Sequence, residues 1–263
     1  MDVALKVVAL IVLLFLTQEL LRRASKWVVW TLFLVVPVLL TPYWFRINDF
    51  GLFPWIKIYS VCVCVIWGTA VRHTSLGDRP WARLGIPLLL AANIIEATLL
   101  DLIEYGLAHS VNAAVGVLLI ATMPYGAKDT RVDSQSRDLY YGTTGTWVCA
   151  YTLWNWTFVY LNYPTMTGLH TAVLASGLIV AAGNPQRWVQ SRAYFLGLML
   201  IVTATFNAEL LRWMDTSNWS NERLGVAAAI ASLALAIRCS VKAYSMQDES
   251  DRDILRMPQL SVA

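Results

Sequence analysis

Charged residues are scarce in this sequence, and their scarcity indicates the class of protein. Asp, Glu, Lys and Arg together make up only 14% of the 263 residues, whereas hydrophobic residues make up 57%. A soluble domain of this length carries about a quarter charged residues. The mean hydropathy of +0.55 points the same way. The composition therefore excludes an ordinary soluble domain and predicts an integral membrane protein.

Side chains that hold metals, cofactors or nucleic acids are also few. The three histidines lie near the ends of apolar segments, and the four cysteines have neither zinc spacing nor a CxxC pair. There is no glycine-rich phosphate loop, no GxSxG, no Asp-rich DDxxD motif and no basic stripe. All five lysines fall at or beyond the expected membrane edges, which leaves none for a retinal Schiff base. We expect no metal, no cofactor and no nucleic-acid partner.

Apolar blocks fill most of the chain, and their length of about 17–23 residues suits a ~30 Å hydrocarbon core. We expect an all-α polytopic helical bundle with one transmembrane domain over residues 1–245 and a polar, disordered cytosolic tail over 246–263. Two weak places, the junction at Gly106 and the short seventh segment, leave seven or eight spans open. The nine expected spans are 3–21, 27–43, 55–71, 84–106, 107–124, 144–162, 168–183, 193–213 and 224–242.

Lys and Arg are distributed unevenly between the two sides that nine spans define. Fifteen fall on one side and five on the other, a clear bias toward a cytosolic face. We therefore expect an outside N-terminus and a cytosolic C-terminus, in an endomembrane if the source is eukaryotic. The smaller group is Lys6, Arg46, Lys57, Arg212 and Arg223.

The fourth expected span carries polar residues inside the hydrocarbon. At 100° per residue, Asn93, Glu96, Asp101 and Glu104 fall within an arc of about 140° on one helix face. Glu96 is expected near the midplane, where an unpaired carboxylate costs several kcal/mol or stays protonated. We expect it to be neutral, because no basic residue is expected nearby. A purely structural hydrogen-bond cluster is the alternative interpretation.

The sixth expected span carries an aromatic stripe. Trp147, Tyr151, Trp154 and Phe158 recur at helical spacing, and Asn155 lies beside them. Aromatic residues at this spacing are often core packing, and that interpretation stays open. If they line a cavity instead, their π-faces are suited to stabilising a cation.

The eighth expected span adds Asn207 and Glu209, although Glu209 can also pair with Arg212 three residues later. Under the expected topology these residues share their depth with Glu96, Asp101 and the aromatic stripe. We therefore predict one apolar cavity between the fourth, fifth, sixth and eighth spans, with a few converging polar groups.

Two resemblances can be stated on these residues. The segments Phe33–Pro42, Trp55–Ser60, Ala92–Ala97 with Asp101, and Ala150–Tyr160 resemble a family of small bacterial membrane proteins, most of them uncharacterised. The size, the aromatic content and the acidic tail are also similar to the membrane-bound terpene cyclases of fungal meroterpenoid pathways. The catalytic motif of those cyclases has no residue-by-residue match here, so this likeness implies only a reaction class.

That class is the cyclisation of a prenyl chain that begins when an epoxide or alkene is protonated. It needs a neutral carboxylic acid and a dry aromatic cavity. We expect Glu96 as the acid, with Asp101 as second choice or partner and Asn93 orienting the carboxyl. The substrate would be a lipophilic prenylated small molecule that arrives from the bilayer. The alternative is a proton-coupled or cation transporter that uses the same intramembrane carboxylates.

Overall fold

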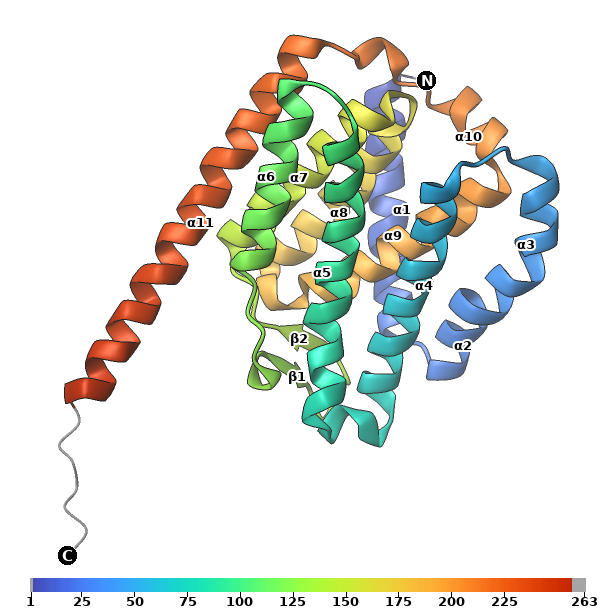
Figure 1. The fold of residues 1–263 in the computed structure, drawn as a ribbon. Helices are drawn as coiled ribbons and strands as arrows, with labels where there is room; N and C mark the ends of the chain where they lie inside the picture. The colour runs from blue at the N-terminus through green and yellow to red at the C-terminus, as the bar shows by residue number, and fades with distance from the viewer. Residues whose placement is uncertain (1, 257–263) are drawn as a thin grey trace, which may run out of the picture.

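The computed structural model describes residues 2–256, with side chains up to residue 245 except that of Tyr244. The chain forms a bundle of helices with one short hairpin at one end (Figure 1). The helices are α1 (Val3–Arg23), α2 (Lys26–Trp30), η1 (Thr31–Val35), α3 (Val36–Ile47), α4 (Leu52–His73), α5 (Pro80–Ile103), α6 (Leu107–Ala121), α7 (Gly145–Asn162), α8 (Thr167–Gly183), α9 (Trp188–Thr205), α10 (Asn207–Trp213) and α11 (Glu222–Arg256). The strands are β1 (Thr130–Val132) and β2 (Leu139–Tyr141), and short 3₁₀ turns fill several connections.

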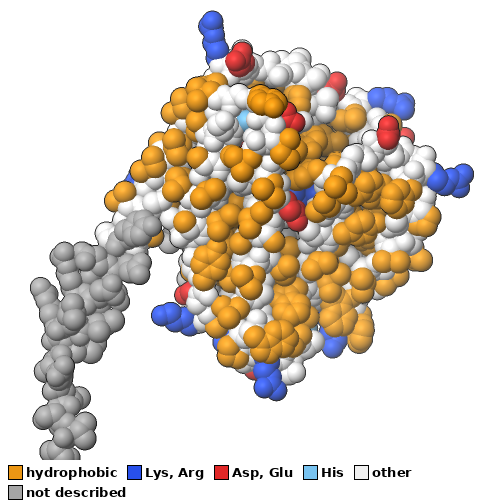
Figure 2. Space-filling model, viewed as in Figure 1, with side chains coloured by type: hydrophobic (Ala, Val, Ile, Leu, Met, Phe, Trp, Pro, Cys, Tyr) orange, Lys and Arg blue, Asp and Glu red, His pale blue; other side chains and the backbone are white. Residues whose placement is uncertain are grey.

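The all-α membrane bundle is confirmed, whereas the count of nine spans is not. Within residues 2–256, six helical segments are long and apolar enough to cross a membrane, or seven if the bent pair α9–α10 is one span. The 15-residue α6 is short for a crossing. Figure 2 shows the outward face covered by hydrophobic side chains. Leu88, Leu99 and Ile103 of α5 are among the exposed ones. The protein is therefore a multi-pass membrane protein.

The last helix differs from the prediction. We expected a span that ends near residue 242 and a disordered tail from residue 246, but α11 continues to Arg256. Residues 246–256 contain neither Gly nor Pro, so nothing in the sequence stops the helix there. The rest of the expected tail, residues 257–263, lies outside the described residues.

The second expected span contains a wide π-helical turn, and proline accounts for its position. Pro37 has no N–H to donate to the preceding turn, and η1 comes immediately before it. Pro42 lies further along α3. Thr41 Oγ donates to the carbonyl of Pro37 at 2.7 Å. Lys26–Ile47 nevertheless forms one apolar helical segment of 22 residues.

The α9–α10 pair is broken instead of continuous, with a bend of 103°. Phe206, at the break, leaves the helical backbone region with φ −126° and ψ 36°. Asn48, just after α3, donates from Nδ2 to the carbonyl of Ala204 at 2.8 Å. This bond satisfies a carbonyl near the end of α9 that has lost its helical partner. The expected span 193–213 is therefore interrupted at Phe206.

The centre of the bundle is α7, which packs against α6, α8 and α11. Its Trp154 is fully buried, and the indole Nε1 donates to the carbonyl of Asn112 on α6 at 2.9 Å. Gly116 of α6 allows α5 to approach closely, because a Cβ there would lie 2.1 Å from Thr98 Oγ. This core holds α5 and α7 in fixed positions on either side of the candidate site.

A charged network closes the end of the bundle that carries the hairpin. Asp138, next to β2, accepts a hydrogen bond from Arg22 at 2.7 Å and lies 4.0 Å from both Arg72 and Arg187. Its side chain is 4% exposed. Glu19 binds Arg22 and Arg187 at 2.8 and 3.0 Å. Buried arginines are thus matched to carboxylates at this end.

Candidate functional site

A cavity of about 370 Å³ lies between α4, α5, α7, α8 and α9, next to the loop segment 49–51. Its walls are mainly apolar and include the rings of Phe53, Phe158 and Tyr163. Phe53 stacks on Tyr163 with 6.0 Å between ring centroids. In Figure 2 the hydrophobic face is hollowed beside the upper part of α5, with charged atoms visible in the hollow. Cavities of this size and lining typically bind small molecules.

Arg192 of α9 is the buried cation of this cavity. The residue is 4% exposed and lines the wall. Its Nη2 donates to Asn155 Oδ1 at 2.7 Å, and its guanidinium carbon lies 5.9 Å from the ring centroid of Tyr151. Its Nε and Nη1 have no hydrogen-bond partner among the described side chains. No ion pair among the described residues includes Arg192.

Asn155 connects Arg192 to a histidine of the neighbouring helix. Its Oδ1 also lies 2.7 Å from Nε2 of His170 on α8. An amide oxygen only accepts, so Nε2 of His170 carries the proton in this bond. Asn155 is predicted correctly as a polar residue of the cavity, but it offers its oxygen to a cation already in the protein. One neutral acceptor does not balance the charge of Arg192.

Glu96 is not the unpaired carboxyl that the sequence predicts. Its Oε2 lies 2.9 Å from Nζ of Lys57 on α4 and accepts a hydrogen bond from Ser60 at 3.1 Å. The two charged side chains are only 12% and 20% exposed. The expectation that no basic residue lies near Glu96 is therefore wrong, because α4 begins earlier than expected and carries Lys57 into the bundle. The pair lies at the seam between α4 and α5.

Asn93, one turn before Glu96, lines the cavity as predicted. It does not orient the Glu96 carboxyl through any hydrogen bond found among the described residues. Its backbone carbonyl instead accepts from Lys57 Nζ at 3.2 Å. Lys57 is thus held by two groups of α5, the Glu96 carboxylate and the Asn93 carbonyl. Its side chain forms part of the cavity wall.

Asp101 lies in a separate cluster at the far end of α5. Its side chain is fully buried and accepts from Asn112 at 2.7 Å, from Asn162 at 2.9 Å and from His109 Nδ1 at 2.9 Å. None of these four residues lines the cavity. Because its two oxygens already accept three bonds, Asp101 fits the structural alternative, in which it ties α5, α6 and α7 together. The predicted partnership with Glu96 is not formed.

The aromatic stripe of α7 is mainly core packing. Trp147 stacks on Tyr151 with 5.5 Å between ring centroids, and Tyr151 meets Trp188 edge-on at 4.6 Å. Trp154 belongs to the same buried cluster. Only Phe158 reaches the cavity described above. The packing interpretation that the sequence left open therefore accounts for most of the stripe.

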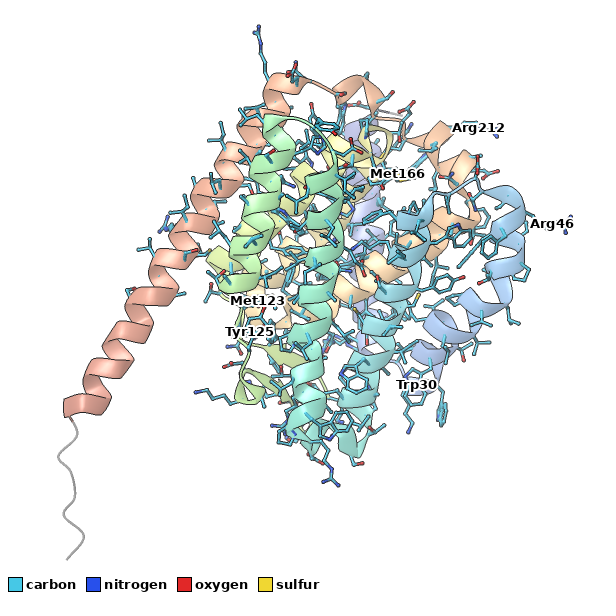
Figure 3. The ribbon with its side chains drawn as sticks, in the orientation of Figure 1. Trp30, Arg46, Met123, Tyr125, Met166 and Arg212 are labelled. Carbon is cyan, nitrogen blue, oxygen red and sulfur yellow. The ribbon has the colours of Figure 1, made fainter. Side chains whose placement is uncertain are left out.

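Asn207 and Glu209 lie on α10, beyond the bend, and neither lines the cavity. Glu209 is exposed and forms no ion pair with Arg212 among the described residues. Figure 3 shows Arg46 and Arg212 pointing outward at the end opposite Trp30. We predicted a cavity between the fourth, fifth, sixth and eighth spans. Three of these, the helices α5, α7 and α9, do line the cavity. The fifth span, α6, is replaced by α4 and α8.

Lys57, Arg192 and His170 are the residues that sequence reasoning missed at this site. Lys57 and Arg192 were assigned to the two membrane edges because the third and eighth spans were expected to begin at residues 55 and 193. The helices begin at Leu52 and Trp188, so both cations lie inside them. The apolar residues that flank each cation, such as Trp188 and Val189, were the available signal.

Tyr163 lies between α7 and α8 and contributes a phenolic hydroxyl to this wall. Burial, together with the nearby charge of Glu104, raises the pKa of Tyr163 to about 12. The phenol therefore stays protonated at neutral pH and can donate a hydrogen bond to a ligand. Among the described side chains, no three His, Cys, Asp or Glu residues lie close enough together to hold a metal ion.

The Lys57–Glu96 ion pair leads to a prediction about the free energy of unfolding. We expect Lys57→Met and Glu96→Gln each to lower the free energy of unfolding by up to about 3 kcal/mol, because each leaves a poorly solvated charge alone. The double variant should lose less than the two single variants combined. Apparent melting temperatures in detergent, measured by tryptophan fluorescence, check this. Glu209→Gln, at an exposed carboxylate, is the control. If the two single variants have the same melting temperature as the control variant, the ion pair does not stabilise the protein.

Comparison with known proteins agrees with the first of the two resemblances. No curated protein and no solved structure matches the chain. The likeness to terpene cyclases thus receives no support from these searches. One family model, described as a family of unknown function, matches almost the whole length, from residue 1 to residue 256. The chain is a member of that family, DUF5692.

Proposed function

We propose that this protein binds a lipophilic small molecule with an anionic head group, inside the membrane, in the cavity beside Arg192. The observation that carries the proposal is the buried guanidinium of Arg192, which has two unpaired nitrogens and lies in a mainly apolar wall. The ligand's anion would occupy the position beside Nε and Nη1. Its tail would lie among the rings of Phe53 and Phe158.

The charge balance supports an anionic head group. A buried cation without a counterion costs several kcal/mol of desolvation. Lys57 is matched by Glu96, and Arg72 lies 4.0 Å from Asp138, but Arg192 has only an amide oxygen and an aromatic face. A carboxylate or phosphate suits the planar guanidinium, which presents several donors in a fixed geometry.

The surroundings of Arg192 support a lipophilic tail. The wall combines the aromatic rings with Leu169, Leu196 and Met199. The seam between α4 and α5, where the half-buried Lys57–Glu96 pair lies, offers a route from the bilayer. Ile95 and Leu99, on either side of Glu96 along α5, are 44% and 53% exposed and face outward. A ligand dissolved in the bilayer would therefore meet this seam directly.

The geometry of the cavity supports the predicted cyclase less well than it supports binding of an anion. A proton-initiated cyclisation needs a neutral acid at the cavity and surroundings that tolerate a carbocation. Glu96 forms an ion pair, and Asp101 lies outside the cavity. The unpaired Arg192 would repel a developing cation. Membranes that convert a prenylated epoxide with wild-type protein, but not with Glu96→Gln, would favour the cyclase instead.

We also propose that the end of the bundle bearing Arg22, Arg72 and Arg187 faces the cytosol. The basic residues of the sequence concentrate in the loops at that end, as the positive-inside rule requires. The C-terminus would then be cytosolic as well, at an endomembrane in a eukaryotic source.

Reporter fusions test this orientation. Fusions at Asp133 and at Ala263 should both report the cytosol, and a fusion at Asn218 should report the outside. Asn218 lies in the connection between α10 and α11, and Asp133 lies in the hairpin at the opposite end. If Asn218 and Ala263 report the same side, α11 does not cross the membrane.

Binding is tested with three probes that share one acyl chain. Oleoyl lysophosphatidic acid carries a phosphate, oleate carries a carboxylate, and monooleoylglycerol carries no charge. We expect purified protein in detergent to bind at least one of the two anions ten times or more tightly than monooleoylglycerol. Whichever anion binds more tightly identifies the head group.

Arg192→Met should remove that preference, and Arg192→Lys should keep part of it. One charge-assisted set of hydrogen bonds contributes about 1.5–3 kcal/mol, which is roughly a 10- to 150-fold change in Kd. Arg212→Met, at an exposed arginine, is the matched control and should bind as wild type. Equal affinities for all three probes, or an unchanged preference in Arg192→Met, contradict the proposal.

A further inference from the structure

A second cavity continues the first toward the hairpin end of the bundle. It measures about 70 Å³ and is lined by Gly68, Thr69 and Arg72 of α4, by Leu139 of β2 and by Gln190 of α9. The first cavity instead reaches Asp49 and Gly51 at the opposite end of α4. The two cavities therefore lie in sequence along the same helices.

Three residues belong to the walls of both cavities: Asn93, Arg192 and Leu196. They form the partition between the two spaces. Arg192 binds Asn155 in the wall of the first cavity and lies over Tyr151 in the wall of the second. The unpaired cation thus has neighbours on both sides of the partition.

The lining residues of the two cavities together extend along most of α4 and α9. Along α4 their linings extend from Phe53 to Arg72, which is about 28 Å at ~1.5 Å per residue. Along α9 they extend from Trp188 to Ala204, or about 24 Å. The hydrocarbon core of a bilayer is about 30 Å thick. The two cavities, which share three lining residues, therefore lie one after the other along a length of helix close to that thickness.

Basic side chains lie at the start, the middle and the end of these linings, and the middle one, Arg192, is the one without an ion pair among the described residues. Lys57 lies near one end, Arg192 at the partition and Arg72 at the other end. Arg72 is 1% exposed and donates to the hydroxyl of Tyr194 and to the carbonyl of Arg137. The unmatched positive charge of Arg192 between the two cavities favours the passage of anions and opposes that of cations.

We propose that the protein moves the anionic head group of its ligand from one leaflet to the other along these two cavities. This inference rests on the binding proposed above, with Arg192 as the shared anchor. The head group passes the partition when Leu196 and Asn93 move aside, while the tail leaves the rings of Phe53 and Phe158 through the α4–α5 seam and follows in the bilayer. At the far end of the second cavity, Arg72 donates to Tyr194 and Leu139 of the hairpin adds to the lining.

Gly68 gives a way to block the path without touching the first cavity. It lines only the second cavity, and a Cβ built on it meets no atom within 4 Å. A leucine at this position would fill the second cavity without a clash at its Cβ. Gly183, at the end of α8, also has open space around its Cβ and lines neither cavity, so it provides the matched control.

The experiment measures lipid transfer between leaflets. Full-length protein is reconstituted into phosphatidylcholine vesicles that hold lysophosphatidic acid with an NBD-labelled acyl chain, and dithionite bleaches the label in the outer leaflet. Wild-type protein should make the protected inner pool accessible, whereas labelled lysophosphatidylcholine should stay protected. Gly68→Leu should slow transfer tenfold or more, Gly68→Ala less, and Gly183→Leu not at all.

Binding measured on the same preparations separates this inference from the proposed function. Gly68→Leu should bind lysophosphatidic acid within twofold of wild type, which also shows that the variant is folded. Wild-type protein that binds the probe without moving it overturns the transfer and leaves the binding proposal intact. A Gly68→Leu variant that transfers at the wild-type rate overturns the path. If wild-type protein does not bind lysophosphatidic acid at all, both proposals are overturned.

Discussion

A cation buried in a membrane protein needs a counter-charge, and the arrangement of this bundle depends on how each cation is matched. Arg22 and Arg187 share the carboxylates of Glu19 and Asp138 at the hairpin end. Lys57 is matched by Glu96 on the facing helix. Arg192 alone among these cations is held by a neutral amide and an aromatic ring. Burying a charge without a counter-charge costs free energy, so an anionic ligand would stabilise the protein most at this arginine.

The rest of the fold explains why Arg192 stays in place without a carboxylate. The core around Trp154 and Trp188 fixes α7 against α6 and α9. Asn155 of α7 then accepts a hydrogen bond from the guanidinium, and His170 of α8 holds the Asn155 amide oxygen in place. The break at Phe206 ends α9 soon after the cavity, and the cap from Asn48 satisfies the carbonyl of Ala204 there. An arginine placed on such rigid elements is preorganised for an anion, because little further ordering is needed on binding.

Much of the helix pattern could be predicted from the sequence, because long apolar blocks and proline or glycine boundaries are local signals. The helical spacing on α7 correctly placed its aromatic residues on one face, and Asn155 beside them reached the cavity. The partners of Glu96 and Asp101 could not be predicted. Lys57 is 39 positions from Glu96 in the chain, and the cluster around Asp101 draws on α6 and α7. Such pairings depend on which helices are neighbours, and periodicity carries no information about that.

Small errors in helix ends had the largest effect on the functional interpretation. A shift of three to five residues in the starts of α4 and α9 moves Lys57 and Arg192 from the membrane edge to the cavity wall. The direct test of the resulting account is photo-crosslinking in native membranes, with a lysophosphatidic acid whose chain ends in a diazirine. The account predicts that the label attaches to cavity residues such as Phe158 and Met199, and that Arg192→Met removes this labelling. Label confined to outward-facing residues such as Leu13 and Leu20 of α1, with no effect of Arg192→Met, would contradict it.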